Sequence, residues 1–73
     1  MKDYQFTVVT ERDEDGRIVA ICPALPGCYT EGDTEQEAME MIRDAIQLHV
    51  EDHLARGEPI NEEVGVSRVK IAV

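Results

Sequence analysis

The stretch CPALPGCYTEGDT, residues 22–34, decides the fold of this chain. It places two prolines, two cysteines and two glycines between two apolar segments. Pro26 and Gly27 fit the second and third positions of a type II turn, because proline supplies the fixed φ and glycine the positive φ. Each proline also pushes the residue before it toward an extended conformation. The stretch therefore predicts a corner that leads out of one strand, through a short strand at residues 28–32, and into a helix.

Two strands and a tight turn are predicted before this corner. Residues 4–11, YQFTVVTE, alternate between apolar and polar side chains, which is the period of a strand with one buried face. Asp15 and Gly16 follow as a hairpin signal, because glycine accepts the positive φ that such turns require. Residues 18–22, IVAIC, then predict the antiparallel return strand.

One helix is predicted over residues 35–55. Thr34, with Glu37 three residues later, fits a capping box, and Asp33 is an alternative N-cap. Gly57 suits the position just after the helix, and a proline at residue 59 ends it. The residues spaced three and four apart form one apolar stripe that is expected to face the sheet: Ala38, Met41, Ile42, Ala45, Ile46, Leu48 and His49.

Residues 66–73, VSRVKIAV, alternate again and predict a last strand. Because the helix can act as a crossover, this strand can join the sheet in parallel. The expected fold is a two-layer α+β domain of order β-β-β-α-β, with one helix on a small, mostly antiparallel sheet. This arrangement is similar to part of a ribonuclease H fold. We expect residues 1–73 to form a single domain.

Size and charge restrict the classes of function. A chain of 73 residues is marginally stable alone, which favours a homodimer or a higher homo-oligomer. The 16 acidic and 7 basic residues give a net charge of −9, which argues against direct binding of nucleic acid and favours a basic protein partner. The alternative is that the charge only maintains solubility. No apolar run approaches the roughly 20 residues of a membrane span, so we expect a cytoplasmic protein without membrane contact.

The cysteines and histidines raise the question of a metal or catalytic site. Cys22, Cys28, His49 and His53 form a set that zinc can use, but five residues separate the cysteines where zinc sites usually have two to four. Cys28 with His49 forms a possible nucleophile pair, but no third group stands out to orient the base. The acidic residues lie in turns and on the predicted solvent face of the helix, so they do not converge as nuclease carboxylates do. We therefore expect no metal, no cofactor and no catalytic residues, with both cysteines acting as small buried hydrophobes.

The ordered set of these marks resembles the HicB-like antitoxin family over most of the chain, from about Tyr4 to Pro59. The residues that carry the resemblance are Asp15-Gly16, the IVAI strand, Pro23, Leu25-Pro26-Gly27-Cys28, Gly32-Asp33-Thr34, Glu37-Ala38, Ala45 and Gly57-Glu58-Pro59. The resemblance implies a partial ribonuclease H-like domain without nuclease activity. It also implies binding and inhibition of HicA, a small basic toxin that cuts messenger RNA.

Many members of that family carry a second domain that binds DNA, and we expect none here because the sequence stops at Val73. The expected function is an antitoxin-type module that masks a HicA-like toxin, and the alternative is a stand-alone interaction or regulatory domain without a toxin partner. The residues expected to contact the partner are acidic and outward: Glu31, Asp33, Glu37, Glu40 and Asp44.

Overall fold

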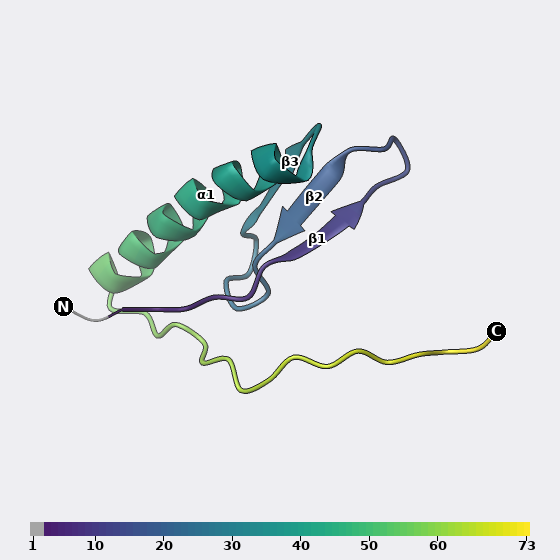
Figure 1. Ribbon diagram of the computed structural model, residues 1–73. Helices are drawn as coiled ribbons and strands as arrows, with labels where there is room; N and C mark the ends of the chain where they lie inside the picture. Colours follow the sequence, from purple (N-terminus) through teal and green to yellow (C-terminus); the bar gives the residue numbers. More distant parts are fainter. Residues whose placement is uncertain (1–2) are drawn as a thin grey trace.

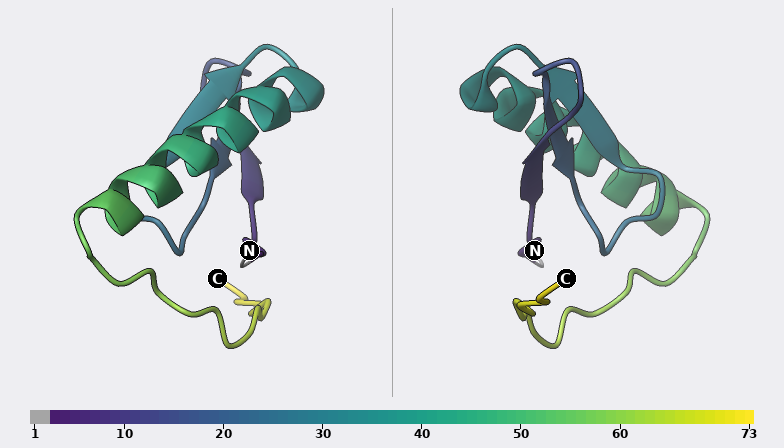
Figure 2. Two further views of the ribbon diagram at one scale, coloured as in Figure 1. Left: turned by 90° about the vertical axis from the view of Figure 1, so that its left-hand side faces the viewer. Right: turned by 90° about the vertical axis from the view of Figure 1, so that its right-hand side faces the viewer.

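The computed structural model describes residues 3–73, which form three strands and one long helix (Figure 1). The elements are β1 (Val9–Arg12), β2 (Ile18–Ile21), β3 (Tyr29–Gly32) and α1 (Glu35–Ala55). The strands make one antiparallel sheet in the order β1-β2-β3. The helix crosses one face of this sheet diagonally (Figure 2). The predicted α+β class is confirmed.

The turn between β1 and β2 sets the register of the first hairpin. Val9 lies opposite Ile21. Gly16 has a φ of +83°, as the predicted turn requires. The Asp13 carboxylate accepts hydrogen bonds from the backbone amides of Asp15 and Arg17, each at 2.9 Å. The prediction of a tight turn at Asp15 and Gly16 is confirmed.

The corner between β2 and β3 is a closed loop. The Cys28 amide donates to the Leu25 carbonyl at 3.0 Å, and Gly27 has a φ of +80°, so Pro26 and Gly27 occupy the predicted turn positions. The Cys22 amide donates to the Cys28 carbonyl at 3.0 Å, which closes the base of the loop. The loop therefore turns the chain back so that β3 pairs with β2.

Both ends of α1 are capped by their own sequence. Thr34 is the N-cap, and its hydroxyl accepts a hydrogen bond from the Glu37 amide at 3.1 Å. At the other end Gly57 has a φ of +68°, and the Glu58 amide donates to the His53 carbonyl at 2.9 Å, as in a Schellman motif. The helix bounds agree with the prediction. Within residues 3–73, no helix combines the length and the apolar character that crossing a membrane requires.

The core lies between α1 and the sheet. Its buried residues come from β2, the corner and the first half of α1: Ile18, Ala20, Cys22, Leu25, Cys28, Ala38 and Ile42. Met41 and Leu48, which the sequence placed on the buried stripe, are exposed instead. At 100° per residue they lie about 60° and 80° from Ala38 around the helix, beyond the width that three strands cover.

The helix and the sheet approach each other closely at Gly32, the last residue of β3. A Cβ atom built on Gly32 would lie 2.8 Å from the backbone nitrogen of Ala38 and 3.1 Å from the Cβ atom of Glu37. Thr30, two residues earlier, donates its hydroxyl to the Ala38 carbonyl at 2.9 Å. These contacts hold the first turn of α1 against β3.

The predicted last strand, residues 66–73, is not part of the sheet. This segment is extended, but no residue in it has a strand partner within residues 3–73. A strand forms only when a neighbour accepts and donates its backbone hydrogen bonds, and here the chain runs past the β1 edge without joining it (Figure 1). The prediction of a fourth strand is wrong for the single chain. The resemblance to a ribonuclease H fold, which depends on that strand, is not confirmed.

Candidate protein-binding surfaces

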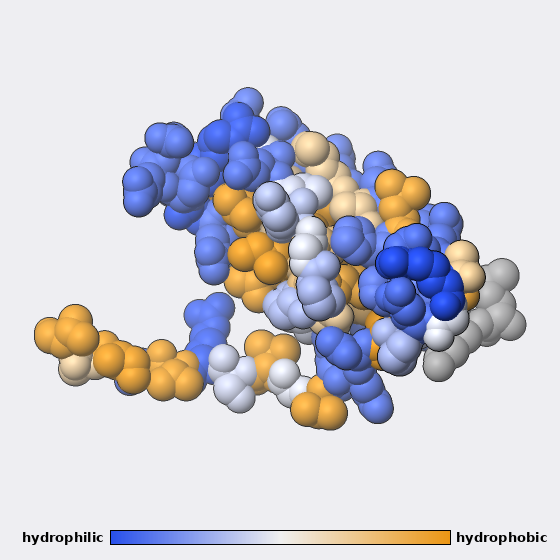
Figure 3. All heavy atoms as spheres, turned by 180° about the vertical axis from the view of Figure 1, so that it is seen from behind, coloured by the Kyte–Doolittle hydropathy of each residue, from blue (hydrophilic) through white to orange (hydrophobic). Residues whose placement is uncertain are grey.

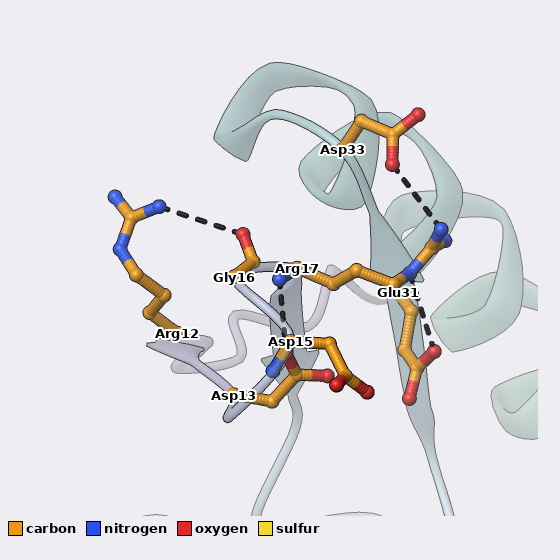
Figure 4. A network of polar contacts seen from close by, with 7 residues as sticks. All are labelled: Arg12, Asp13, Asp15, Gly16, Arg17, Glu31 and Asp33. Carbon is orange, nitrogen blue, oxygen red and sulfur yellow. Dashed lines mark hydrogen bonds and ion pairs between the residues drawn. The ribbon is translucent and has the colours of Figure 1, made fainter.

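Arg17 is the centre of a polar network beside the first hairpin (Figure 4). Its Nη1 atom lies 3.1 Å from Oδ1 of Asp33, and its Nε atom lies 3.6 Å from Oε2 of Glu31. The guanidinium therefore reaches from the residue just before β2 to Glu31 of β3 and to the residue just after β3. Both carboxylates, which we expected to meet a partner, are paired within the chain, so they present less free negative charge than their exposure suggests.

The other three acidic residues expected at the site lie together, on the exposed face of α1. Glu37, Glu40 and Asp44 are spaced three and four apart, so they follow one side of the helix. None of them has a basic partner among the ion pairs of the described residues, and Glu40 accepts a hydrogen bond from the Gln36 amide group at 3.3 Å. The expected set is thus divided between two surfaces of the molecule.

Exposed apolar side chains lie beside these carboxylates. Met41 and Leu48 are 46% and 66% exposed. They alternate with acidic residues along one line of the helix. We call this line and the neighbouring Glu40 the outward stripe, which consists of Glu37, Glu40, Met41, Asp44, Leu48 and Glu51. Protein interfaces combine apolar contact with a polar rim, and methionine is enriched in them. The stripe has the composition of a surface for a basic protein.

A second surface lies on the face of the sheet that α1 leaves open. Val19 and Ile21 of β2 are half-buried there, and Tyr29 of β3 is 62% exposed. A shallow hollow of about 350 Å³ adjoins them, and prolines 23 and 26 of the corner line it. The titratable groups that line the hollow are the two cysteines and Tyr29.

The candidate zinc residues do not form a cluster. Cys22 and Cys28 are free thiols buried in the core, and burial raises the pKa of both. The ring of His53 donates from Nδ1 to the His49 carbonyl at 2.8 Å, which occupies that nitrogen within the helix. Within residues 3–73, no group of three or more histidine, cysteine or acidic side chains is placed to hold a metal ion.

Sequence reasoning missed two parts of these surfaces. It assigned Met41 and Leu48 to the core because both fit helical spacing, and that spacing does not show how far the sheet extends beneath α1. It also missed the role of Arg17, because the ion pairs join residues of neighbouring strands and depend on the register between β2 and β3. A side chain that pairs across strands leaves no mark in the spacing of its own segment.

The chain is a small two-layer domain with a capped helix, buried thiols and acidic and apolar outer surfaces. Residues 6–72 match the family described as the HicB-like antitoxin of bacterial toxin–antitoxin systems. The chain belongs to this family.

Curated relatives agree with this assignment. A UPF0150 protein of Synechocystis is 42% identical over 60 residues, which cover 82% of this chain and 76% of the relative. A UPF0150 protein of Archaeoglobus fulgidus is 37% identical over 92% of this chain and 94% of the relative. The protein named Antitoxin HicB 1 of Photorhabdus laumondii is 33% identical over 82% of this chain, which corresponds to 39% of that relative. No solved structure matches the chain.

Proposed function

We propose that this protein is an antitoxin-type module that binds and masks a small basic toxin of the HicA kind, which cuts messenger RNA. Membership of the HicB-like antitoxin family and the similarity to Antitoxin HicB 1 support a role in toxin–antitoxin pairs. The proposed role is binding rather than catalysis. The proposed location is the cytoplasm, where such a toxin meets its RNA.

The outward stripe carries the proposal. A toxin that cuts RNA needs positive charge to hold phosphates, and the same charge is attracted to Glu37, Glu40 and Asp44. Complementary charge raises the rate of encounter, and the exposed Met41 and Leu48 supply apolar contact area once the complex forms. Glu31 and Asp33 contribute less in this proposal, because their ion pairs with Arg17 offset part of their charge.

The test uses a charge reversal that spares the helix cap. The double variant Glu40→Lys and Asp44→Lys leaves Thr34 and its hydrogen bond to the Glu37 amide in place. The matched control is Glu14→Lys with Glu62→Lys, two exposed positions away from the stripe that change the net charge equally. The measurements are growth rescue on co-expression with a small basic protein encoded beside this gene, and association kinetics with the purified toxin.

We expect the stripe variant to associate with the toxin about tenfold more slowly at low salt, and its association rate to lose most of its dependence on salt. The control variant should keep the wild-type association rate and its salt dependence. Charges on a surface are screened beyond about 8 Å at physiological salt, so the two variants should differ most at low salt. Equal slowing in both variants, or rescue that is insensitive to the stripe, would remove this surface from the mechanism. Tight binding to duplex DNA at physiological salt would overturn the function itself.

The alternative is a stand-alone homo-oligomeric interaction or regulatory domain without a toxin partner. The open face of the sheet, with Tyr29 and its neighbouring hollow, favours contact with some protein and does not select a toxin. Gene neighbourhood separates the two functions, since an antitoxin of this kind lies beside a small basic reading frame. In both cases we propose that the protein is a homo-oligomer, because its fold leaves apolar groups in solvent.

A further inference from the structure

The last ten residues form an extended arm, residues 64–73, which leaves the body of the protein (Figure 1). Its apolar side chains lie in solvent along the whole arm (Figure 3): Val64, Val66, Val69, Ile71 and Val73. Val69 and Ile71 are 78% and 72% exposed. Isolated apolar residues on a surface are ordinary, but five of them without cover in one ten-residue segment are not.

The dimensions of the chain show how much surface the arm leaves uncovered. The accessible surface is 6123 Å², whereas a compact monomer of 8.2 kDa exposes roughly 4,500 Å². The radius of gyration is 13.9 Å, against about 11 Å for a compact domain of this length. The excess is roughly 1,600 Å² per copy, so covering it in a dimer would bury an area typical of obligate homodimers.

The body offers a place for a strand at the β1 edge. Among residues 3–73, β1 has a strand neighbour only on the β2 side, so alternate residues of β1 direct their amides and carbonyls outward. Between this edge and α1 lies a hollow of about 320 Å³, lined largely by apolar side chains that include Phe6, Val8 and Ile46. The hollow is open where a fourth strand would cover it.

The chain's own arm does not fill this place. Glu63, just before the arm, accepts hydrogen bonds from the Thr7 amide at 2.6 Å and from the Thr7 hydroxyl at 2.7 Å. These bonds lower the pKa of the Glu63 carboxyl. A side chain, rather than backbone, thus bridges the two segments, and a space of about 620 Å³ separates residues 7–10 from residues 66–69. The arm therefore runs near β1 but is too far from it to form backbone hydrogen bonds.

We propose that the arm of a second copy enters this space and pairs with β1 as the fourth strand of the sheet. In Figure 1 the arm runs in the same direction as β1. A two-fold axis between the arms of two copies therefore makes each inserted arm antiparallel to its two neighbours, which are the β1 strand with which it pairs and the other arm. Val69, Ile71 and Val73 lie on one side of the arm and fit the hollow under α1 of the second copy.

Charge supports a second copy as the occupant. The arm carries Arg68 and Lys70 and no acidic residue, and the whole chain has a net charge of −9, so the rest of the chain carries −11 (−9 minus +2). The body is therefore complementary in charge to the arm. The inference deepens the homo-oligomer of the proposed function and rests on it, but it does not depend on the toxin.

The test is an isotope-filtered NMR experiment on the full chain. Labelled and unlabelled protein are unfolded together and refolded, so that half of the dimers contain one copy of each kind. We expect contacts between the Val69 and Ile71 methyl groups of one copy and Phe6 or Val8 of the other. Contacts found only within one copy would show that the arm closes on its own β1, and no contacts would show a free arm; either result overturns the proposal.

A matched pair of variants tests the same proposal by size. Ile71→Lys changes a side chain that is 72% exposed in the single chain, so a free arm tolerates it. In the exchanged dimer it places a charge in the apolar hollow. We expect light scattering to give a dimer for the wild type and for the control Glu62→Lys, and a monomer for Ile71→Lys. A wild-type monomer, or an Ile71→Lys dimer as stable as the control, would refute arm exchange.

The two proposals fail separately. Arm exchange is refuted without harm to the toxin proposal if Ile71→Lys stays dimeric and toxin binding is intact. The toxin proposal is refuted without harm to arm exchange if the filtered contacts appear and no toxin is bound.

Discussion

Replacement of Gly32 should destabilise the protein, because this position has no room for a side chain. The change is Gly32→Ala. The added Cβ atom would lie 2.8 Å from the Ala38 backbone nitrogen, and 3.1 and 3.2 Å from side-chain atoms of Glu37. The side chain of Glu37 can move, but the Ala38 nitrogen belongs to the first turn of α1, and its amide donates to the Thr34 carbonyl at 3.0 Å. The helix must therefore shift as a unit.

The magnitude follows from two opposing effects. Overpacking of this kind costs about 1–3 kcal/mol. Replacing a glycine whose φ is not positive by alanine stabilises the protein by about 0.4–1 kcal/mol, because the unfolded chain loses conformational entropy. The midpoints of the two ranges give a net loss of about 1.3 kcal/mol, which lowers the melting temperature of a domain this size by roughly 5–10 °C. The assay is thermal unfolding by circular dichroism at one fixed protein concentration, since association also changes the melting temperature.

Gly65→Ala is the matched control, because nothing lies within 4 Å of a Cβ atom there and its φ is not positive. We expect the control to melt within a few degrees of the wild type. If Gly32→Ala melted at or above the temperature of Gly65→Ala, the close approach of helix and sheet would not limit this position, and the account of how β3 holds α1 would be wrong.

The remaining predictions concern the corner, the helix cap and the buried thiols. Gly27→Val should cost about 1–3 kcal/mol in urea unfolding, because a β-branched residue must then adopt the φ of +80°. Thr34→Ala should cost about 1 kcal/mol in the same assay, because the Glu37 amide loses its acceptor. The thiols of Cys22 and Cys28 should react slowly with alkylating reagents in the native state. Burial raises the pKa of both thiols above 9.0, the value for an unfolded chain. Their contribution to stability should therefore be complete below pH 9.0 and be lost as the pH rises through the higher pKa values of the folded state. The double alanine variant should not show this loss.

The features that the sequence predicted correctly depend on neighbours in the chain. Asp15 and Gly16, Pro26 and Gly27, and Thr34 with Glu37 each act over four residues or fewer, so their residue types carry the whole signal. The helix bounds followed from the same kind of local evidence at both ends.

The features that it predicted wrongly or missed depend on distant parts of the chain. Met41 and Leu48 satisfy helical spacing, but whether they are buried depends on the width of the sheet beneath α1. Glu31 and Asp33 are acidic and outward, as expected, but Arg17 reaches both of them across β2 and β3. Spacing along the sequence does not contain either of these distances.

The arm also shows that local sequence does not specify contacts with distant parts of the chain. Residues 66–73 have a strand pattern as regular as that of residues 4–11, yet only the earlier segment contributes a strand to the sheet. The difference lies in the connection, because a tight turn at Asp15 and Gly16 places β2 directly beside β1 as its neighbour. The arm follows a 21-residue helix and an extended segment, and neither specifies a neighbour. A strand pattern with an unspecified neighbour can take one from its own chain or from a second copy, and the Glu63 carboxylate on Thr7 favours the second copy by holding the arm away from its own β1 edge.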